Sequence, residues 1–121
     1  MLLIDREEDE KNVDPDYIVV LCTAPPAESG KIARLLVEER LAACVSLSAV
    51  RSCFRWEDKI SEETEDLLII KSEGKKLEEL AARIEEVHPY DVLEIIALPI
   101  IGGDDRYLDW ISESLRSTTP P

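Results

Sequence analysis

Thiol and imidazole groups have the most specific chemistry among the side chains of this sequence. The chain has three cysteines, Cys22, Cys44 and Cys53, and one histidine, His88. Thiolate and imidazole are ligands that suit copper and zinc. Cys22 and His88 would supply one ligand of each kind, but two protein ligands leave a metal site incomplete unless carboxylates, water or a neighbouring chain complete it.

Each of these residues also has a structural interpretation. Cys22 ends an apolar run, where a cysteine is a common small core residue, and Cys44 and Cys53 fit packing roles still better. His88 precedes Pro89, and an imidazole at a helix end is able to cap carbonyl groups or join an interface. The ligand and structural interpretations of Cys22 and His88 both stay open at this point.

The composition excludes several function classes. Fourteen Lys and Arg residues against twenty-seven Asp and Glu give a net charge of -13, which repels nucleic acid and anionic membrane surfaces. No apolar stretch approaches the roughly 18 residues that a membrane span needs. The odd number of cysteines, without C-x-x-C spacing, argues against a disulfide framework and predicts a cytoplasmic protein.

Motifs of catalysis are missing from the sequence. It has no G-x-S-x-G, no H-E-x-x-H and no phosphate-binding loop. Glu94 and His88 are able to do acid-base chemistry, but nothing in the pattern points to a substrate. The acidic runs 62–66 and 85–86 are interpreted as solvated surface and not as cation sites. We therefore expect a binding protein and not an enzyme.

The elements that position these residues follow the order strand, helix, strand, strand, helix, strand, helix. At 121 residues the chain has room for one domain, expected over 17–116 between flexible tails at 1–16, which is acidic, and 117–121. The order predicts the α+β, ferredoxin-like split βαβ fold (βαββαβ) with a C-terminal helix. The predicted strands are 17–22, a long hairpin of 43–56 and 60–71, and 93–98. The first helix follows Pro25 and Pro26, and Ser72 and Asp104 or Asp105 are the expected caps of the second and third helices.

The hairpin is the most unusual element of this prediction. Its first strand of fourteen residues would extend ~46 Å, whereas a globule of this size is about 35 Å across. A change of apolar phase predicts a bulge near Ala49 and Val50. The tip carries Phe54, Trp56 and Ile60, and an isolated ribbon is marginal in water, so we expect another chain to cover it.

Several motifs in the same order resemble the CutA divalent-ion tolerance proteins. The resemblance covers 17–116 and is carried by Val20-Leu21-Cys22-Thr23-Ala24-Pro25, Leu41-Ala42-Ala43-Cys44-Val45, Arg55-Trp56-Glu57, His88-Pro89-Tyr90-Asp91-Val92, Glu94-Ile95-Ile96-Ala97-Leu98-Pro99-Ile100 and Tyr107-Leu108-Asp109-Trp110. It implies a homotrimer similar to the nitrogen-regulatory PII trimers, a cytoplasmic location, and binding of copper and other divalent metals, zinc included.

The resemblance also implies site residues. Relatives bind metal through a cysteine at the position of Cys22 and a histidine pair before the proline; here His88 is present, while Val87 takes the first position. Trp56, Lys71, Tyr90 and Glu94 are expected to form a polar pocket between subunits. The primary hypothesis is a homotrimeric copper-binding protein of metal-ion tolerance. A PII-like scaffold with a small ligand or partner protein in its clefts is the alternative, and a small hydrolase or isomerase is the third.

Overall fold

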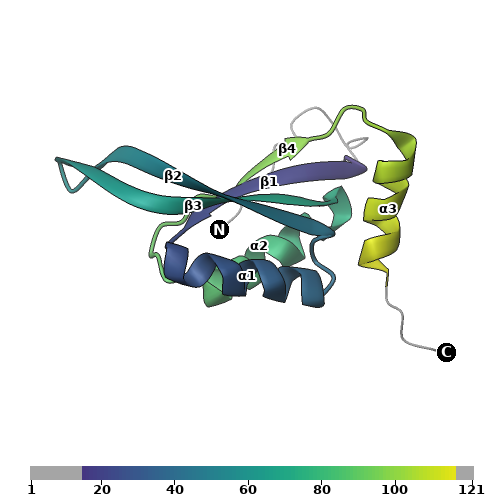
Figure 1. Cartoon of the computed structure of the whole chain (residues 1–121), viewed down its shortest axis with the longest axis horizontal. Coiled ribbons are helices and arrows are strands. Elements are labelled where there is room, and N and C mark those ends of the chain that lie inside the picture. The colour runs from purple at the N-terminus through teal and green to yellow at the C-terminus, as the bar shows by residue number, and fades with distance from the viewer. Residues whose placement is uncertain (1–14, 117–121) are drawn as a thin grey trace.

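The strands form a single antiparallel sheet in the order β2-β3-β1-β4, and three α-helices accompany it (Figure 1). The computed structural model describes residues 15–116, so the predicted tails lie outside the described residues except for Pro15 and Asp16. The strands are β1 (Tyr17–Ala24), β2 (Cys44–Trp56), β3 (Lys59–Glu73) and β4 (Ile96–Pro99). The helices are α1 (Pro26–Glu38), α2 (Leu77–Val87), preceded by the short turn η1 (Gly74–Lys76), and α3 (Asp105–Leu115). This confirms the predicted α+β class and βαββαβ order.

Helices α1 and α2 lie on the same side of the sheet and build the core with it (Figure 1). Along β1, fully buried residues alternate with half-buried ones. Only the face toward α1 and α2 is closed, because the two helices cover one side. Its core residues are Ile18, Val20, Cys22 and Ala24 of β1, Ile32 and Leu36 of α1, Leu68 and Ile70 of β3, and Leu80 and Ile84 of α2.

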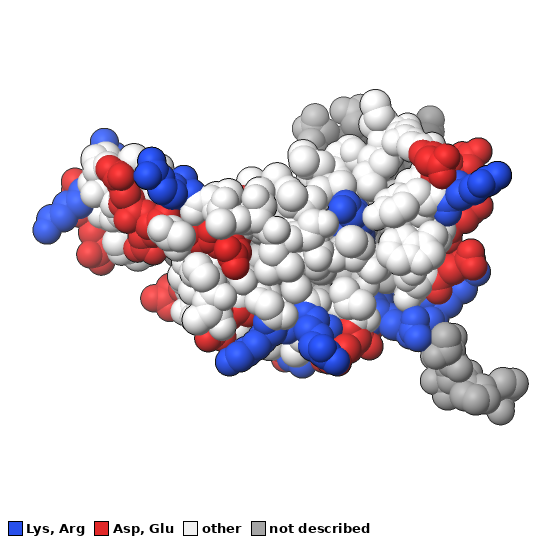
Figure 2. Space-filling model, viewed as in Figure 1, with Lys and Arg blue, Asp and Glu red and all other residues white. Residues whose placement is uncertain are grey.

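The opposite side of the sheet, which we call the open face, is also apolar. Val19 pairs with Leu98, and Leu21 pairs with Ile96 and Ile69. Leu98 and Ile96 are 46% and 48% exposed, while Val19, Leu21 and Ile69 are half-buried. Figure 2 shows few charged atoms across the middle of the molecule and many along the hairpin and the helices. A surface of this kind is typical of an interface with another chain.

Helix α3 packs against one end of the sheet through Ile111 and Leu115, which contact Ala43. Asp104 caps it, as predicted, by accepting a hydrogen bond from the Tyr107 backbone N–H at 3.1 Å. Trp110 stays 43% exposed, and its ring lies against Tyr107. Its stripe of the helix turns away from Ile111, so the sheet does not reach it.

The part of the hairpin beyond β1, residues 50–65, is called the arm. The β1–β3 pairing ends at Ala24 and Asp66, whereas the β2–β3 pairing runs on to Trp56 and Lys59. The register is unbroken from Cys44 to Trp56, so the predicted bulge is wrong. The apolar phase changes because most of the arm extends beyond the globule, where it is buried on neither face in its own chain. The predicted turn is present, with positive φ at Glu57 (50°) and Asp58 (64°).

Two predicted boundaries also differ. Ser72 does not cap α2; it lies in β3, fully buried, and its hydroxyl donates to the Leu41 carbonyl at 2.7 Å. Strand β4 begins at Ile96 and not at Leu93, because Leu93 and Ile95 pack against the core before pairing starts. Pro99 ends this strand at the edge of the sheet, as predicted. Within 15–116, the helices are all too short or too polar to cross a membrane.

Candidate functional site

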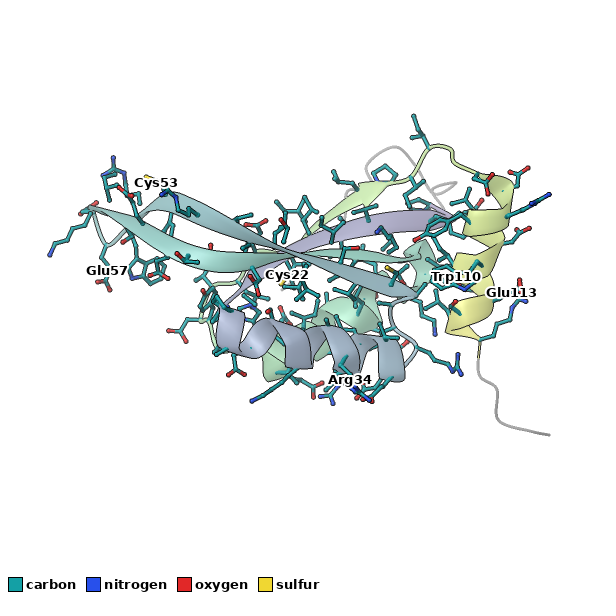
Figure 3. The ribbon with its side chains drawn as sticks, in the orientation of Figure 1. Cys22, Arg34, Cys53, Glu57, Trp110 and Glu113 are labelled. Atoms are coloured by element: carbon teal, nitrogen blue, oxygen red, sulfur yellow. The ribbon has the colours of Figure 1, made fainter. Side chains whose placement is uncertain are left out.

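Cys22 lies on β1 with its side chain toward the helices and no exposed surface (Figure 3). Its Sγ is 3.7 Å from the carbonyl oxygen of Thr23. Burial raises the pKa of the thiol to about 12, and the negative charges of Glu94 and Glu65 act in the same direction. At neutral pH the residue is therefore a protonated thiol, and a metal ion has to displace that proton.

His88 follows α2, which ends at Val87 because Pro89 forces the preceding residue out of the helical region. The imidazole is 8% exposed, and both of its nitrogens are in use. Nε2 lies 2.8 Å from the Thr23 carbonyl, and Nδ1 accepts the Tyr90 backbone N–H at 3.1 Å. A carbonyl only accepts, so Nε2 carries the proton and the ring is the neutral tautomer.

The two predicted metal ligands, Cys22 and His88, share one hydrogen-bond acceptor, the Thr23 carbonyl oxygen. The Cys22 thiol and the His88 imidazole both point at the Thr23 carbonyl oxygen, although they come from β1 and from the end of α2. Thiolate sulfur and imidazole nitrogen are ligand types that soft or borderline cations such as copper and zinc accept. Within residues 15–116 no three Cys, His, Asp or Glu side chains lie close enough to hold an ion. The chain therefore provides a two-donor set that binding partners outside it would have to complete.

Glu65 is a residue of this region that the sequence reasoning missed. The run 62–66 was expected to be solvated, but Glu65 is only 6% exposed, so that expectation is wrong for it. Tyr90 covers it and donates its hydroxyl to Glu65 Oε1 at 3.0 Å. The tyrosine ring also lies against His88, with 4.7 Å between centroids. Strand alternation gave no signal of this burial, since it places Glu65 on the same side of β3 as Ile69 of the open face.

Tyr90 therefore links the carboxylate to the imidazole. Its hydroxyl binds Glu65, its backbone N–H binds His88, and its ring contacts His88. Burial first, and then the hydrogen bond and charge of Glu65, raise the pKa of Tyr90 to about 12. The phenol thus stays a donor throughout the physiological range.

One chain does not assemble the predicted pocket of Trp56, Lys71, Tyr90 and Glu94. Trp56 ends β2 at the tip of the arm and is 49% exposed. Lys71 is half-buried on the open face, where its Nζ donates to Ser46 at 3.3 Å, and Glu94 is an exposed residue before β4. Within residues 15–116 no hydrogen bond or ring contact joins any two of the four.

The other two thiols lie away from Cys22. Cys44 is half-buried at the start of β2, beside α3, where it contributes with burial to a raised pKa of Tyr107. Cys53 is exposed on the arm (Figure 3). All three cysteines are free. Cys53 is thus the thiol most open to adventitious metal, and it is the natural control for Cys22.

Comparison with known proteins agrees with this fold and these residues. The family model of the CutA1 divalent ion tolerance protein matches residues 18–114. The chloroplastic protein CutA of Arabidopsis thaliana is 45% identical over 116 residues, which are 94% of this chain and 63% of that protein. The divalent-cation tolerance protein CutA of Pectobacterium atrosepticum is 43% identical over 103 residues, or 84% of this chain and 94% of that protein.

A solved structure of a related protein has a similar fold. The apo form of the PII-like protein CutA from Nostoc superposes with a TM-score of 0.79 at 33% identity, covering 82% of this chain and 97% of that one. Because the family model matches well over half of the residues and the relatives match at similar identity, the assignment rests on sequence and on fold together. This chain belongs to the CutA1 divalent ion tolerance family.

Proposed function

We propose that this protein is a homotrimeric, cytoplasmic, divalent-cation-binding protein of metal-ion tolerance, with copper as its ion and zinc as the alternative. It is a binding protein and not an enzyme. The observation that carries the proposal is the convergence of Cys22 Sγ and His88 Nε2 on the Thr23 carbonyl oxygen. Membership of a family whose relatives are named for divalent-cation tolerance supports it, and three free cysteines suit a reducing compartment.

Binding at this pair requires proton movements in the chain. Cys22 gives up its thiol proton to solvent, and His88 frees Nε2 when its proton is placed on Nδ1 instead. Nδ1 then no longer accepts the Tyr90 backbone N–H, which it does in the structure at 3.1 Å. The segment after Pro89 thereby loses one of the hydrogen bonds that hold it in place. Cation binding is in this way coupled to the position of Tyr90, which gives the protein a means of response.

Assembly is the second part of the proposal. The open face exposes about half of Leu98 and Ile96, and the arm exposes Phe54, Trp56 and Ile60 with no core beneath them. A second and third copy of the same chain are the occupants that fit, because the apolar open face of each chain and the large apolar side chains on its charged arm cover one another in a closed ring. The arm of one chain then lies near the open face of the next.

The metal proposal is tested by anaerobic calorimetric titration of the reduced protein with Zn(II) as the divalent ion, and with Cu(I) as the state of copper that is compatible with reduced thiols. About one ion per chain is expected for the wild type, with strong loss of binding in Cys22→Ala and in His88→Ala. Cys53→Ala is the matched control, since it also removes one thiol but from the exposed arm. Unchanged binding in the first two variants, or loss only in Cys53→Ala, would reject the assigned ligands.

A second candidate function is a PII-like scaffold that binds a small anion or a partner protein between chains. Trp56 is separated from Lys71, Tyr90 and Glu94 in one chain, so a pocket of these four residues would form only across a subunit boundary, as this candidate requires. Lys71 would supply the positive charge, because within 15–116 it forms no ion pair and donates only to Ser46. The solved Nostoc relative is described as PII-like.

Tryptophan quenching distinguishes this candidate from the first. In a Trp110→Phe variant all tryptophan emission comes from Trp56, and a ligand of the cleft should protect that residue from acrylamide. In the reciprocal Trp56→Phe variant the same ligand should leave the emission of Trp110 unchanged. Protection without measurable cation binding would favour the scaffold function, whereas cation binding without protection by any metabolite tried would disfavour it.

A further inference from the structure

Glu65 has a buried carboxylate with too few partners. The side chain is 6% exposed, and its one hydrogen bond within residues 15–116 is the bond that the Tyr90 hydroxyl donates to Oε1. No Lys, Arg or His of that range forms an ion pair with it. A buried charge is costly unless an opposite charge lies beside it. The described part of the chain therefore contains a buried negative charge without a positive partner.

Lys71 has the opposite deficit on the same side of the sheet. Its side chain is half-buried on the open face, and its Nζ donates to the Ser46 hydroxyl at 3.3 Å. An ammonium group has three donors, and no carboxylate of residues 15–116 forms an ion pair with this one. When another chain covers the open face, the ammonium group loses its remaining contact with water. Lys71 therefore requires an acceptor from outside its own chain, and a carboxylate fits best.

Glu65 and Lys71 are unable to pair with each other within one chain. They lie on the same side of β3, six residues apart, in an unbroken register with β2. Six residues of extended strand are about 20 Å long, whereas the two groups of an ion pair lie within about 4 Å of each other. Leu67 and Ile69 take the positions between them on that side. One side of β3 therefore presents a negative charge, two apolar residues and a positive charge in a row.

We propose that Lys71 of one chain forms an ion pair with Glu65 of the neighbouring chain, and that this contact fixes the alignment of the copies in the trimer. The inference rests on the assembly proposed above. A closed ring joins different patches of neighbouring chains, so the positive end of the row on one chain meets the negative end of the row on the next. Every Lys71 and every Glu65 then has a partner. An anionic ligand of the cleft has to compete with Glu65 for Lys71.

The surroundings of Glu65 favour a lysine as its partner. Little of the side chain is exposed beside Tyr90, and a compact ammonium on a flexible four-carbon stem reaches such an opening more easily than a planar guanidinium does. Lys59 is the other lysine on this side of β3, but it is exposed at the turn of the arm, where water solvates its charge. Lys71 lies among apolar residues and gains more from the pair.

The test measures subunit exchange between tagged and untagged trimers by native mass spectrometry. Glu65→Gln and Lys71→Met each remove one charge and leave the other without a partner. Truncating one member of a buried charged pair acts mainly on dissociation, so each variant should exchange at least about 30-fold faster than the wild type. The double variant leaves no unpaired charge and should exchange far more slowly than the product of the two single effects predicts. Single effects that simply multiply would overturn the inference.

Glu63→Gln and Lys59→Met are the matched controls. Both residues lie on the same side of β3 as the proposed pair, but both are exposed, so exchange should stay within about threefold of the wild-type rate. Faster exchange in Lys59→Met, together with wild-type exchange in Lys71→Met, would assign the contact to the arm and reject Lys71.

Charge reversal shows whether the contact joins different chains. Glu65→Lys and Lys71→Glu each bring like charges together in every contact of their own homotrimer and should weaken it. When the two variants are mixed, the introduced lysine of one faces the introduced glutamate of the other, so mixed trimers should exceed the fraction that random mixing gives. A random distribution of the two variants contradicts the pair. Should Glu65→Lys not fold, the comparison of the single and double neutral variants still decides.

A failure of the assembly is distinguishable from a failure of the pair. A wild-type monomer at micromolar concentration means that the assembly is wrong, and the pair falls with it. A wild-type trimer in which Glu65→Gln and Lys71→Met exchange at the wild-type rate leaves the assembly standing and removes the pair.

Discussion

Lys71 and Trp56 stand at opposite ends of the β2–β3 pairing, where their partners are Cys44 and Lys59. Along an extended strand, the path from Cys44 to Trp56 is roughly 40 Å at about 3.3 Å per residue. No rotation of side chains closes such a distance. A pocket that contains both residues therefore needs the arm of one chain and the sheet of another, and self-association comes before any chemistry of that cleft.

Assembly is checked with one substitution on the open face. Leu98→Lys places a charge on an apolar surface that is 46% exposed in the single chain and that we expect to be buried in the trimer. Val37→Lys is the control, because Val37 on α1 is similarly exposed, at 43%, but lies on a helix on the other side of the sheet. Light scattering should give a trimer for wild type and control and smaller species for Leu98→Lys. A folded wild-type monomer at micromolar concentration would contradict the assembly.

The sequence was sufficient to predict the order of the elements, because local chemistry determines where they begin or end. Pro89 ends α2, Pro99 ends β4 and Asp104 caps α3, and each of these effects acts within a few residues. The position of Glu65 was not predictable in this way. Its burial depends on Tyr90, which comes from a segment after α2, and only the folded chain brings the two together.

The arm is a second feature that could not be predicted correctly from the sequence alone. The apolar pattern from Val45 to Trp56 changes phase, and in a single chain the natural interpretation is a bulge. The register is continuous instead. A pattern of alternation predicts a bulge only where the strand packs on a core, and most of the arm has no core of its own chain beneath it. The error therefore arose from assuming that the arm packs within its own globule.

Cation affinity should rise with pH. The pKa of the Cys22 thiol is raised to about 12, so each ion bound below that pH displaces one thiol proton. The apparent affinity for Zn(II) is then expected to increase about tenfold per pH unit between pH 7 and pH 9. Calorimetry of the Cys53→Ala protein in buffers of different ionisation enthalpy measures the protons released. Release of no proton would show that Cys22 is not a ligand.

The same thiol predicts a loss of stability in alkaline solution. The folded protein holds the Cys22 proton up to a pKa of about 12, while the unfolded chain loses it near the ordinary value of 9. The unfolded state therefore binds fewer protons than the folded state between these values, and the free energy of unfolding falls as pH rises through that window. The slope from this group is about 1.4 kcal/mol per pH unit.

The Cys22→Ala variant separates the contribution of this thiol to the pH dependence of the free energy of unfolding. Its free energy of unfolding should fall less steeply than that of the wild type above pH 9, in denaturant titrations at equal protein concentration. Tyr90, whose pKa is also raised to about 12, titrates in both proteins, and Cys22 is only the smallest of the causes of its shift. Parallel curves for the two proteins between pH 9 and 11 would mean that the thiol is hydrated in the folded state.

The turn of the arm offers a stabilising substitution. Glu57 and Asp58 both adopt positive φ, at 50° and 64°, although neither is glycine. This left-handed conformation costs an ordinary L-residue about 1 kcal/mol or more and glycine very little. Asp58→Gly should therefore raise the free energy of unfolding by up to about 1 kcal/mol, despite the greater freedom of glycine in the unfolded chain. Glu62→Gly, in the strand of the same arm, should lower it instead, because glycine weakens a paired strand. Equal destabilisation by the two glycines in urea titrations would show that the backbone at Asp58 relaxes in solution to negative φ.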